Sequence, residues 1–134
     1  MNSFQLKIVT PDGLQYDGMA QELVVRSTTG DIGILAGHTN CVNPLGMGRA
    51  TVVIDGKKRY AACIGGMLSV VGGKVTLLPT TFEWAENIDK ARAEASYERA
   101  QITIQSKDSS DTDILLAKAR LRRALVRKSV ADIK

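Results

Sequence analysis

A change of pattern at about residue 81 limits the folds open to this chain more than any other feature of its sequence. Before it, short apolar stretches alternate with glycine, proline, asparagine and aspartate, and no stretch has both the length and the period of a helix. After it, the sequence is rich in alanine and charged residues and follows a helical period. We therefore expect a β-rich part at residues 1–84 and a helical part at residues 85–134.

The first part has the alternation of half-buried β-strands. Phe4, Leu6 and Ile8 are separated by polar residues, which is the period of a strand with one face in a core. Asp55-Gly56 and Gly72-Gly73 are strong signals for two-residue hairpin turns. Short strands at roughly 8–12-residue spacing, with turn residues between them, predict an antiparallel sandwich or barrel.

The second part contains two helical stretches joined by the polar segment 106–111. We expect the first helix to begin directly after an Asn87 cap, and the second to be capped by Asp111 or Thr112 and to run to about Val130. Two helices joined by a short loop form an antiparallel hairpin. The expected fold is therefore α+β in two parts, an N-terminal antiparallel β-sandwich followed by a C-terminal two-helix antiparallel hairpin.

The apolar seam between these helices is thin because alanine supplies much of it. The expected apolar positions are Ile88, Ala91, Ala95 and Ile102 in the first helix, and Ile114, Ala117, Leu121, Ala124 and Leu125 in the second. Ala93 and Ala100 keep the neighbouring faces small, which suits close packing of a second helix. A pair of helices with so little large side-chain volume is only marginally stable alone. We expect a tail whose helices can separate.

The net charge of +4 is unevenly placed along the chain. Counting lysine and arginine against aspartate and glutamate, residues 1–84 carry seven against six, residues 85–111 four against six, and residues 112–134 seven against two. A strongly basic last stretch suggests an acidic partner or ligand. A small nucleic-acid-binding adaptor is the alternative, but the sheet part lacks the interleaved aromatic residues that stack on bases.

Motifs for catalysis or metal binding are absent from the sequence. It has neither a Walker A loop nor a G-x-G-x-x-G run, and its one histidine, His38, lies in a glycine-rich loop without an evident catalytic partner. Cys41 and Cys63 show no metal spacing and no disulfide framework, so we expect two reduced core thiols. A small-molecule hydrolase is thus a weak hypothesis, and we expect a chain that is not an enzyme.

No stretch of the sequence predicts a membrane span or a signal peptide. The most apolar window, residues 61–71, is interrupted by glycine and is far shorter than the roughly 20 residues that cross a bilayer. The N-terminus already alternates like a strand, unlike a signal peptide. We expect a protein that is cytoplasmic, or peripheral on a membrane assembly.

A polar group at the start of the helical part has two interpretations. Arg92 and Arg99 are seven residues apart and so nearly eclipsed on one helix face, with Asp89 one turn before them. The group is either a solvated salt-bridge ladder or part of a site for an anionic ligand. If the helices fold back on each other, Arg123 and Arg127 face the first pair, and a polyphosphate would relieve the repulsion among four guanidiniums. Ligand binding would then favour the compact hairpin.

Six short motifs are spread over nearly the whole chain. They are VTPDG at 9–13, GDIGILAGH at 30–38, Gly65-Gly66 before an apolar strand, IDKARA at 88–93, YERA at 97–100 and RKSVADIK at 127–134. Together they resemble the epsilon subunit of bacterial F-type ATP synthases. The resemblance implies a β-sandwich followed by a helical hairpin, in a non-catalytic subunit of the central rotor stalk. Such a subunit is peripheral, on the cytoplasmic face of the bacterial cell membrane.

The same resemblance implies a role for each part. The sandwich would bind the gamma subunit and the c-ring and help to couple proton or sodium flow to ATP synthesis. The hairpin, when extended, would reach along gamma towards the alpha and beta subunits and inhibit ATP hydrolysis. Basic residues of the second helix would then face an acidic segment of beta, and they are Lys118, Arg120, Arg122, Arg123 and Arg127.

Residues 88–93 also match the I/L-D-x-x-R-A motif with which some bacterial members of this family bind ATP in the compact hairpin. By this resemblance the ATP-binding residues are Glu83, Ile88, Asp89, Arg92, Ala93, Arg99, Arg123 and Arg127. ATP would be a regulatory ligand and not a catalytic cofactor. The motif leaves open whether magnesium accompanies it.

Overall fold

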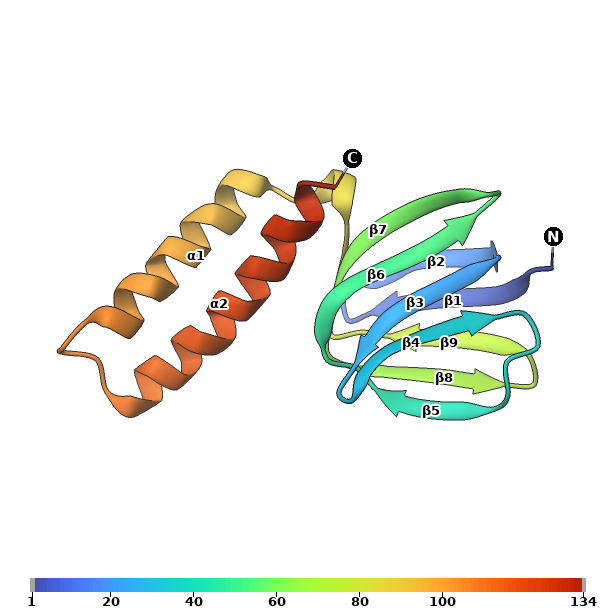
Figure 1. The fold of residues 1–134 in the computed structure, drawn as a ribbon, viewed down its shortest axis with the longest axis horizontal. Helices are drawn as coiled ribbons and strands as arrows, with labels where there is room; N and C mark the ends of the chain where they lie inside the picture. The colour runs from blue at the N-terminus through green and yellow to red at the C-terminus, as the bar shows by residue number, and fades with distance from the viewer. Residues whose placement is uncertain (1, 134) are drawn as a thin grey trace. The chain divides into compact units, whose positions relative to one another are not determined.

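The computed structural model describes residues 2–133 (Figure 1). In this range ten strands are followed by a short 3-10 turn, η1 (Ala85–Asn87), and two α-helices. The chain divides into two compact units, with the boundary between Trp84 and Ala85. The fold expected from the sequence is confirmed, since the strands form a two-sheet sandwich and the helices form a hairpin.

The ten strands are arranged in two five-stranded sheets. Their bounds are β1 Phe4–Thr10, β2 Gly13–Ala20, β3 Glu22–Ser27, β4 Gly30–Leu35, β5 Cys41–Pro44, β6 Met47–Ile54, β7 Lys57–Ile64, β8 Met67–Val71, β9 Lys74–Leu78 and β10 Thr81–Trp84. Sheet 1 has the order β2-β1-β9-β8-β5, and sheet 2 has the order β10-β7-β6-β3-β4. Within the described chain the paired strands are antiparallel except β1 and β9, which run parallel.

The core of the sandwich is formed by the inward-facing side chains of both sheets. Leu6 and Ile8 of β1 are at most 1% exposed, as are Leu77 of β9 and Leu23 and Val52 of sheet 2. Along β1, buried and solvent-facing residues alternate, as the sequence pattern predicts. All side chains of this core cluster belong to the sandwich.

Both predicted two-residue hairpin turns are present. Asp55-Gly56 joins β6 to β7 with φ values of 52° and 76°, and Gly72-Gly73 joins β8 to β9 with φ values of 57° and 80°. Two consecutive residues with positive φ match the right-handed twist of the flanking strands, which is why Asp-Gly and Gly-Gly are favoured there.

The first helix, α1 (Lys90–Gln105), begins later than the sequence indicated. The prediction of Asn87 as its cap was wrong, because Asn87 ends the 3-10 turn. Asp89 has an extended backbone, and its Oδ1 accepts a hydrogen bond from the backbone N–H of Arg92 at 3.1 Å. Both residue types are good caps and they lie two positions apart, so composition alone did not separate them.

The second helix, α2 (Asp111–Ala131), begins at a capping box. Ser110 Oγ accepts from the backbone N–H of Asp113 at 3.1 Å, and Asp113 Oδ2 accepts from the backbone N–H of Ser110 at 3.2 Å. The prediction of Asp111 or Thr112 as the cap was therefore wrong by one or two positions. The reciprocal serine and aspartate three residues apart fix the true start.

The buried residues of the two helices are alanines except Val130, and α1 uses the face opposite to the one predicted. Ala93 and Ala100 are buried, whereas Ile102 is 68% exposed and both Ala91 and Ala95 are exposed. Two residues along a helix is a rotation of about 200°, so the predicted set points away from α2. On α2, Ala117 and Ala124 are buried and Ile114 and Leu121 half-buried as expected, while Leu125 is exposed, against expectation.

Candidate ligand site in the helical hairpin

Two contacts between α1 and α2 define the register of the hairpin. Lys90 Nζ lies 2.5 Å from Asp132 Oδ1, and Lys128 Nζ lies 4.3 Å from the centre of the Tyr97 ring. Both helices advance by about 1.5 Å per residue. The register therefore places Arg99 at about the level of residues 123–127 of α2.

The four arginines of the predicted anion site are thus distributed over the two helices of one unit. Arg92, Arg99 and Arg123 have exposed side chains, and Arg127 is half-buried. Guanidinium groups carry fixed, planar sets of donors that match carboxylate and phosphate oxygens. The hairpin therefore presents a cationic surface to which both helices contribute.

Asp89 and its neighbours have roles in forming the helix as well as the predicted roles in binding. Asp89 lies at the end of α1 and not on its side, because its carboxylate caps the first turn. Ala93 is fully buried in the seam, where a larger side chain would separate the helices. Ile88 is half-buried just before the cap.

Glu83 lies in a different compact unit of the chain from the other predicted ATP-binding residues. It belongs to β10 of the sandwich, where it is half-buried and paired with Ala62 of β7. The remaining seven all belong to the helical unit.

The set predicted to face the beta subunit lies along α2. Lys118, Arg120, Arg122 and Arg123 are exposed, and Arg127 is half-buried. At about 100° per residue these positions spread around much of the helix surface. They form a broad positive surface and not a single stripe.

The contacts that close the hairpin were not predicted from the sequence. Lys90 donates to Asp132, and this hydrogen bond, with the negative charge of the carboxylate, raises the pKa of the Lys90 ammonium. Tyr97 accepts a hydrogen bond from Gln101 Nε2 at 3.2 Å. Opposite charges at the two free ends of an antiparallel helix pair were the signal available in the sequence.

The two cysteines and the histidine match their expected structural roles in part. Cys63 is buried in the core, and this burial raises the pKa of its thiol to about 12. Cys41 is only half-buried, at the edge of the core, with its Sγ 3.9 Å from His38 Nδ1. His38 also places Nδ1 2.8 Å from the carbonyl oxygen of Thr39, which fits a loop-structuring residue.

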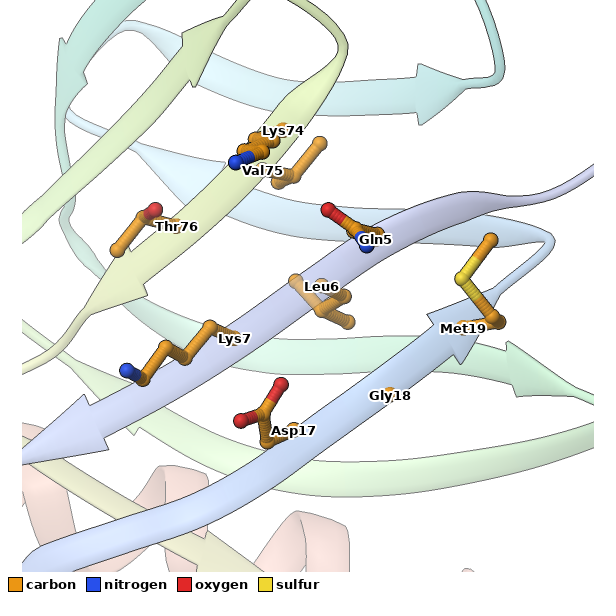
Figure 2. A pocket seen from close by; sticks show the side chains of 9 residues that line it. All are labelled: Gln5, Leu6, Lys7, Asp17, Gly18, Met19, Lys74, Val75 and Thr76. Carbon is orange, nitrogen blue, oxygen red and sulfur yellow. The ribbon is translucent and has the colours of Figure 1, made fainter.

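A concave surface lies on the outer face of sheet 1. Lys7 on β1, Asp17 on β2 and Lys74 on β9 line a hollow of about 300 Å³, and Figure 2 shows how these side chains lie. Lys7 lies opposite Asp17 in the register of the two strands. Charges of both signs on neighbouring strands are typical of a solvated sheet face.

The part of the chain that the structure describes holds neither a cluster of metal-ligating side chains nor a membrane-spanning helix. Nowhere in residues 2–133 do three or more histidine, cysteine, aspartate or glutamate side chains gather as a metal site requires. Neither described helix is long and apolar enough to cross a bilayer.

Comparisons with known proteins match both parts of the chain. The family model "ATP synthase, Delta/Epsilon chain, beta-sandwich domain" matches residues 3–85, and "ATP synthase, Delta/Epsilon chain, long alpha-helix domain" matches residues 86–132. The ATP synthase epsilon chain of Bacillus velezensis is 44% identical over 98% of both chains. That of Bacillus licheniformis is 40% identical over 98% of this chain and 99% of the relative.

Solved structures share the fold. A chain of the Euglena gracilis mitochondrial ATP synthase (OSCP/F1/c-ring) has a TM-score of 0.83 at 23% identity, covering 95% of this chain and 80% of the other. A chain of the Tetrahymena thermophila mitochondrial ATP synthase (central stalk/c-ring) has a TM-score of 0.61 at 11% identity, covering 95% of each. Because the family models span both compact units and the bacterial relatives match end to end, the chain belongs to the epsilon-chain family of ATP synthases.

Proposed function

We propose that this epsilon chain works in the central stalk of an F-type ATP synthase, where it couples ion translocation to ATP synthesis and restrains ATP hydrolysis. Its sandwich binds the gamma subunit and the c-ring, and its hairpin acts on the alpha and beta subunits when extended. As a subunit of this kind it is non-catalytic, and it is peripheral on the cytoplasmic face of the membrane. Membership of the epsilon-chain family supports this proposal.

An apolar surface on sheet 1 supports the role of the sandwich. Leu14 pairs with Val9, Leu78 pairs with Met67, and Met67 pairs with Pro44. Val9 and Leu78 line one hollow of about 300 Å³. We call these five residues the apolar row. It crosses all five strands of sheet 1 on the outward face.

The exposure of the apolar row is the observation that favours a protein partner. Leu14, Met67 and Leu78 are 58%, 39% and 46% exposed. Contiguous exposed apolar surface on a soluble domain usually marks an interface. We assign the apolar row to the gamma subunit. In the proposed stalk, gamma and this chain rotate together, and a permanent complex of this kind requires a stable, apolar interface.

Binding to purified gamma subunit tests this assignment. Leu78→Glu and Met67→Glu place a charge within the apolar row and should weaken the complex at least tenfold, since a buried unpaired carboxylate is strongly unfavourable. Leu35→Glu is the matched control, because Leu35 is as exposed but lies in sheet 2. Native affinity in both row variants would refute the assignment.

The hairpin is the regulatory part in this proposal. The exposed positive surface of α2 suits an acidic segment of the beta subunit, and the same helix contributes Arg123 and Arg127 to an ATP site with Asp89, Arg92 and Arg99. Glu83, Ile88 and Ala93 complete the proposed site. ATP bound there stabilises the compact hairpin and so opposes the extended, inhibitory form. Whether magnesium accompanies ATP is decided by titration with and without the ion.

A further inference from the structure

The N-terminus of α1 and the C-terminus of α2 each carry a charged side chain whose sign is unfavourable for the macrodipole of its own helix. Lys90 is the first residue of α1, where the helix macrodipole is positive, and the first turn of α1 has no acidic residue. Asp132 is the C-cap of α2, where the macrodipole is negative. Neither charge suits the dipole of the helix to which it belongs, although Glu94, one turn along α1, attracts Lys90.

In the closed hairpin each of these charges is favourable for the neighbouring helix. Lys90 Nζ lies 2.5 Å from Asp132 Oδ1, so the lysine is beside the negative end of α2 and the aspartate beside the positive end of α1. Antiparallel packing therefore gives both charges a favourable field that they lack when the helices separate. The carboxylate correspondingly raises the pKa of Lys90.

A second contact lies at the same end of the hairpin. Lys128, one turn before Asp132, places its Nζ 4.3 Å from the centre of the Tyr97 ring. Apart from Val130, the buried residues of the two helices are alanines, which offer little apolar area. Polar contacts at this end therefore supply a larger share of the stability of the closed hairpin than they would between two leucine-rich helices.

We propose that Lys90 and Asp132 form an electrostatic clasp that favours the closed hairpin and makes its opening depend on ionic strength. The side chains are 54% and 56% exposed, so salt reaches and screens the pair. An exposed pair changes an equilibrium only by roughly two- to fivefold, which biases the hairpin without locking it. The regulatory meaning of the clasp rests on the proposed function, in which opening of the hairpin is the inhibitory motion.

Hydrogen exchange of the full-length, nucleotide-free protein tests the clasp. Lys90→Gln and Asp132→Asn should each speed exchange of the amides at 93–97 and 124–131 by roughly two- to fivefold. The effect of the double variant should be smaller than the product of the two single effects, because the interaction between Lys90 and Asp132 is lost only once. Lys107→Gln and Asp108→Asn, in the loop between the helices, are controls with the same changes of charge.

Salt provides the second readout. Raising the salt from about 20 mM to about 500 mM should shrink the difference in exchange rate between the native chain and the double variant towards zero, because the other charges of the hairpin are the same in both. Additive effects of the single variants, equal effects of the loop controls, or a difference between the native chain and the double variant that salt leaves unchanged would each overturn the clasp. These exchange experiments contain no nucleotide, so a negative result would reject the clasp without bearing on ATP binding. Conversely, a chain that shows the clasp but does not bind ATP would reject only the proposed ATP site.

Discussion

Gly66 is the residue in the sandwich where an added methyl group would meet the closest backbone. It has a φ of 95°, and a Cβ there would lie 2.0 Å from the carbonyl oxygen of Leu78 and 2.6 Å from Pro79 Cα. Its own carbonyl accepts from the backbone N–H of Leu45 at 2.8 Å, which ties the turn to the connection between β5 and β6. We expect Gly66→Ala to lower the free energy of unfolding by about 2–4 kcal/mol.

Denaturation by urea, followed by the fluorescence of Trp84, measures this loss. Gly37→Ala is the control, because Gly37 also has a positive φ, of 83°, but a Cβ there would have no atom within 4 Å. It should lose only about 1 kcal/mol, from backbone strain alone. Equal losses in the two variants would show that the close approach to Leu78 has no energetic weight.

The two cysteines should differ in reactivity towards alkylating reagents because Cys63 is buried and Cys41 is only half-buried. Burial raises the pKa of Cys63 to about 12, so its thiol stays protonated in the folded state while the thiol of the unfolded chain ionises near pH 9. This contribution to stability is present below pH 9 and is lost as the pH rises from there towards 12. At pH 8 we expect alkylation of Cys41 well before Cys63, as measured by mass spectrometry of the native protein. Equal rates would contradict the burial of Cys63.

At the scale of single elements, α1 shows which features the sequence could and could not predict. Its existence, its length and its antiparallel partner follow from composition and period. Its inward face does not, because alanine occurs on both sides of the helix, and only Tyr97 and Ala100 facing α2 settle the choice. The start of α1 was missed for a similar reason, since Asn87 and Asp89 are equally good caps.

The alanine seam can be tested by adding volume to it. Ala100→Leu inserts three carbon atoms where the side chain is 4% exposed and should destabilise the hairpin by about 1–3 kcal/mol. Ala95→Leu, on the exposed face of the same helix, should be nearly neutral. Helical circular dichroism on heating measures both. A neutral Ala100→Leu would mean that the helices are not closely packed there.

For the whole molecule, the division into two parts was predictable and the pairing of strands was not. The change of pattern near residue 81 lies close to the boundary after Trp84. The parallel pairing of β1 with β9 joins segments more than 60 residues apart, and no local pattern specifies it. The ATP and partner residues came from the family resemblance, since spacing alone indicated only an anion site.

Deletion of the helical unit tests whether the two parts have separate roles. The sandwich core contains only residues up to Trp84, so a chain ending at Glu86 should fold and unfold cooperatively. In the assembled synthase we expect this chain to keep assembly and coupling and to relieve the inhibition of ATP hydrolysis. Steady-state hydrolysis and ATP-driven ion pumping measure these effects. Loss of assembly would instead give the helices a structural role.

Two kinds of substitution at Asp89 separate ligand binding from helix capping. Asp89→Ala removes the cap and should cost about 1 kcal/mol of helix stability whatever the ligand does. Asp89→Asn keeps a capping side chain and removes only the charge. Arg92→Ala leaves the cap in place, because the bond to Asp89 uses the backbone N–H of Arg92.

Calorimetric titration of ATP into the full-length chain, with and without magnesium, is the most direct test of the regulatory proposal. We predict saturable binding of one ATP per chain, lost in Arg92→Ala and weakened in Asp89→Asn. Lys107→Ala, which removes a positive charge from the loop between the helices, is the matched control and should leave binding unchanged. Absence of binding heat, or the same affinity in Arg92→Ala as in the native chain, would contradict an ATP site in the hairpin.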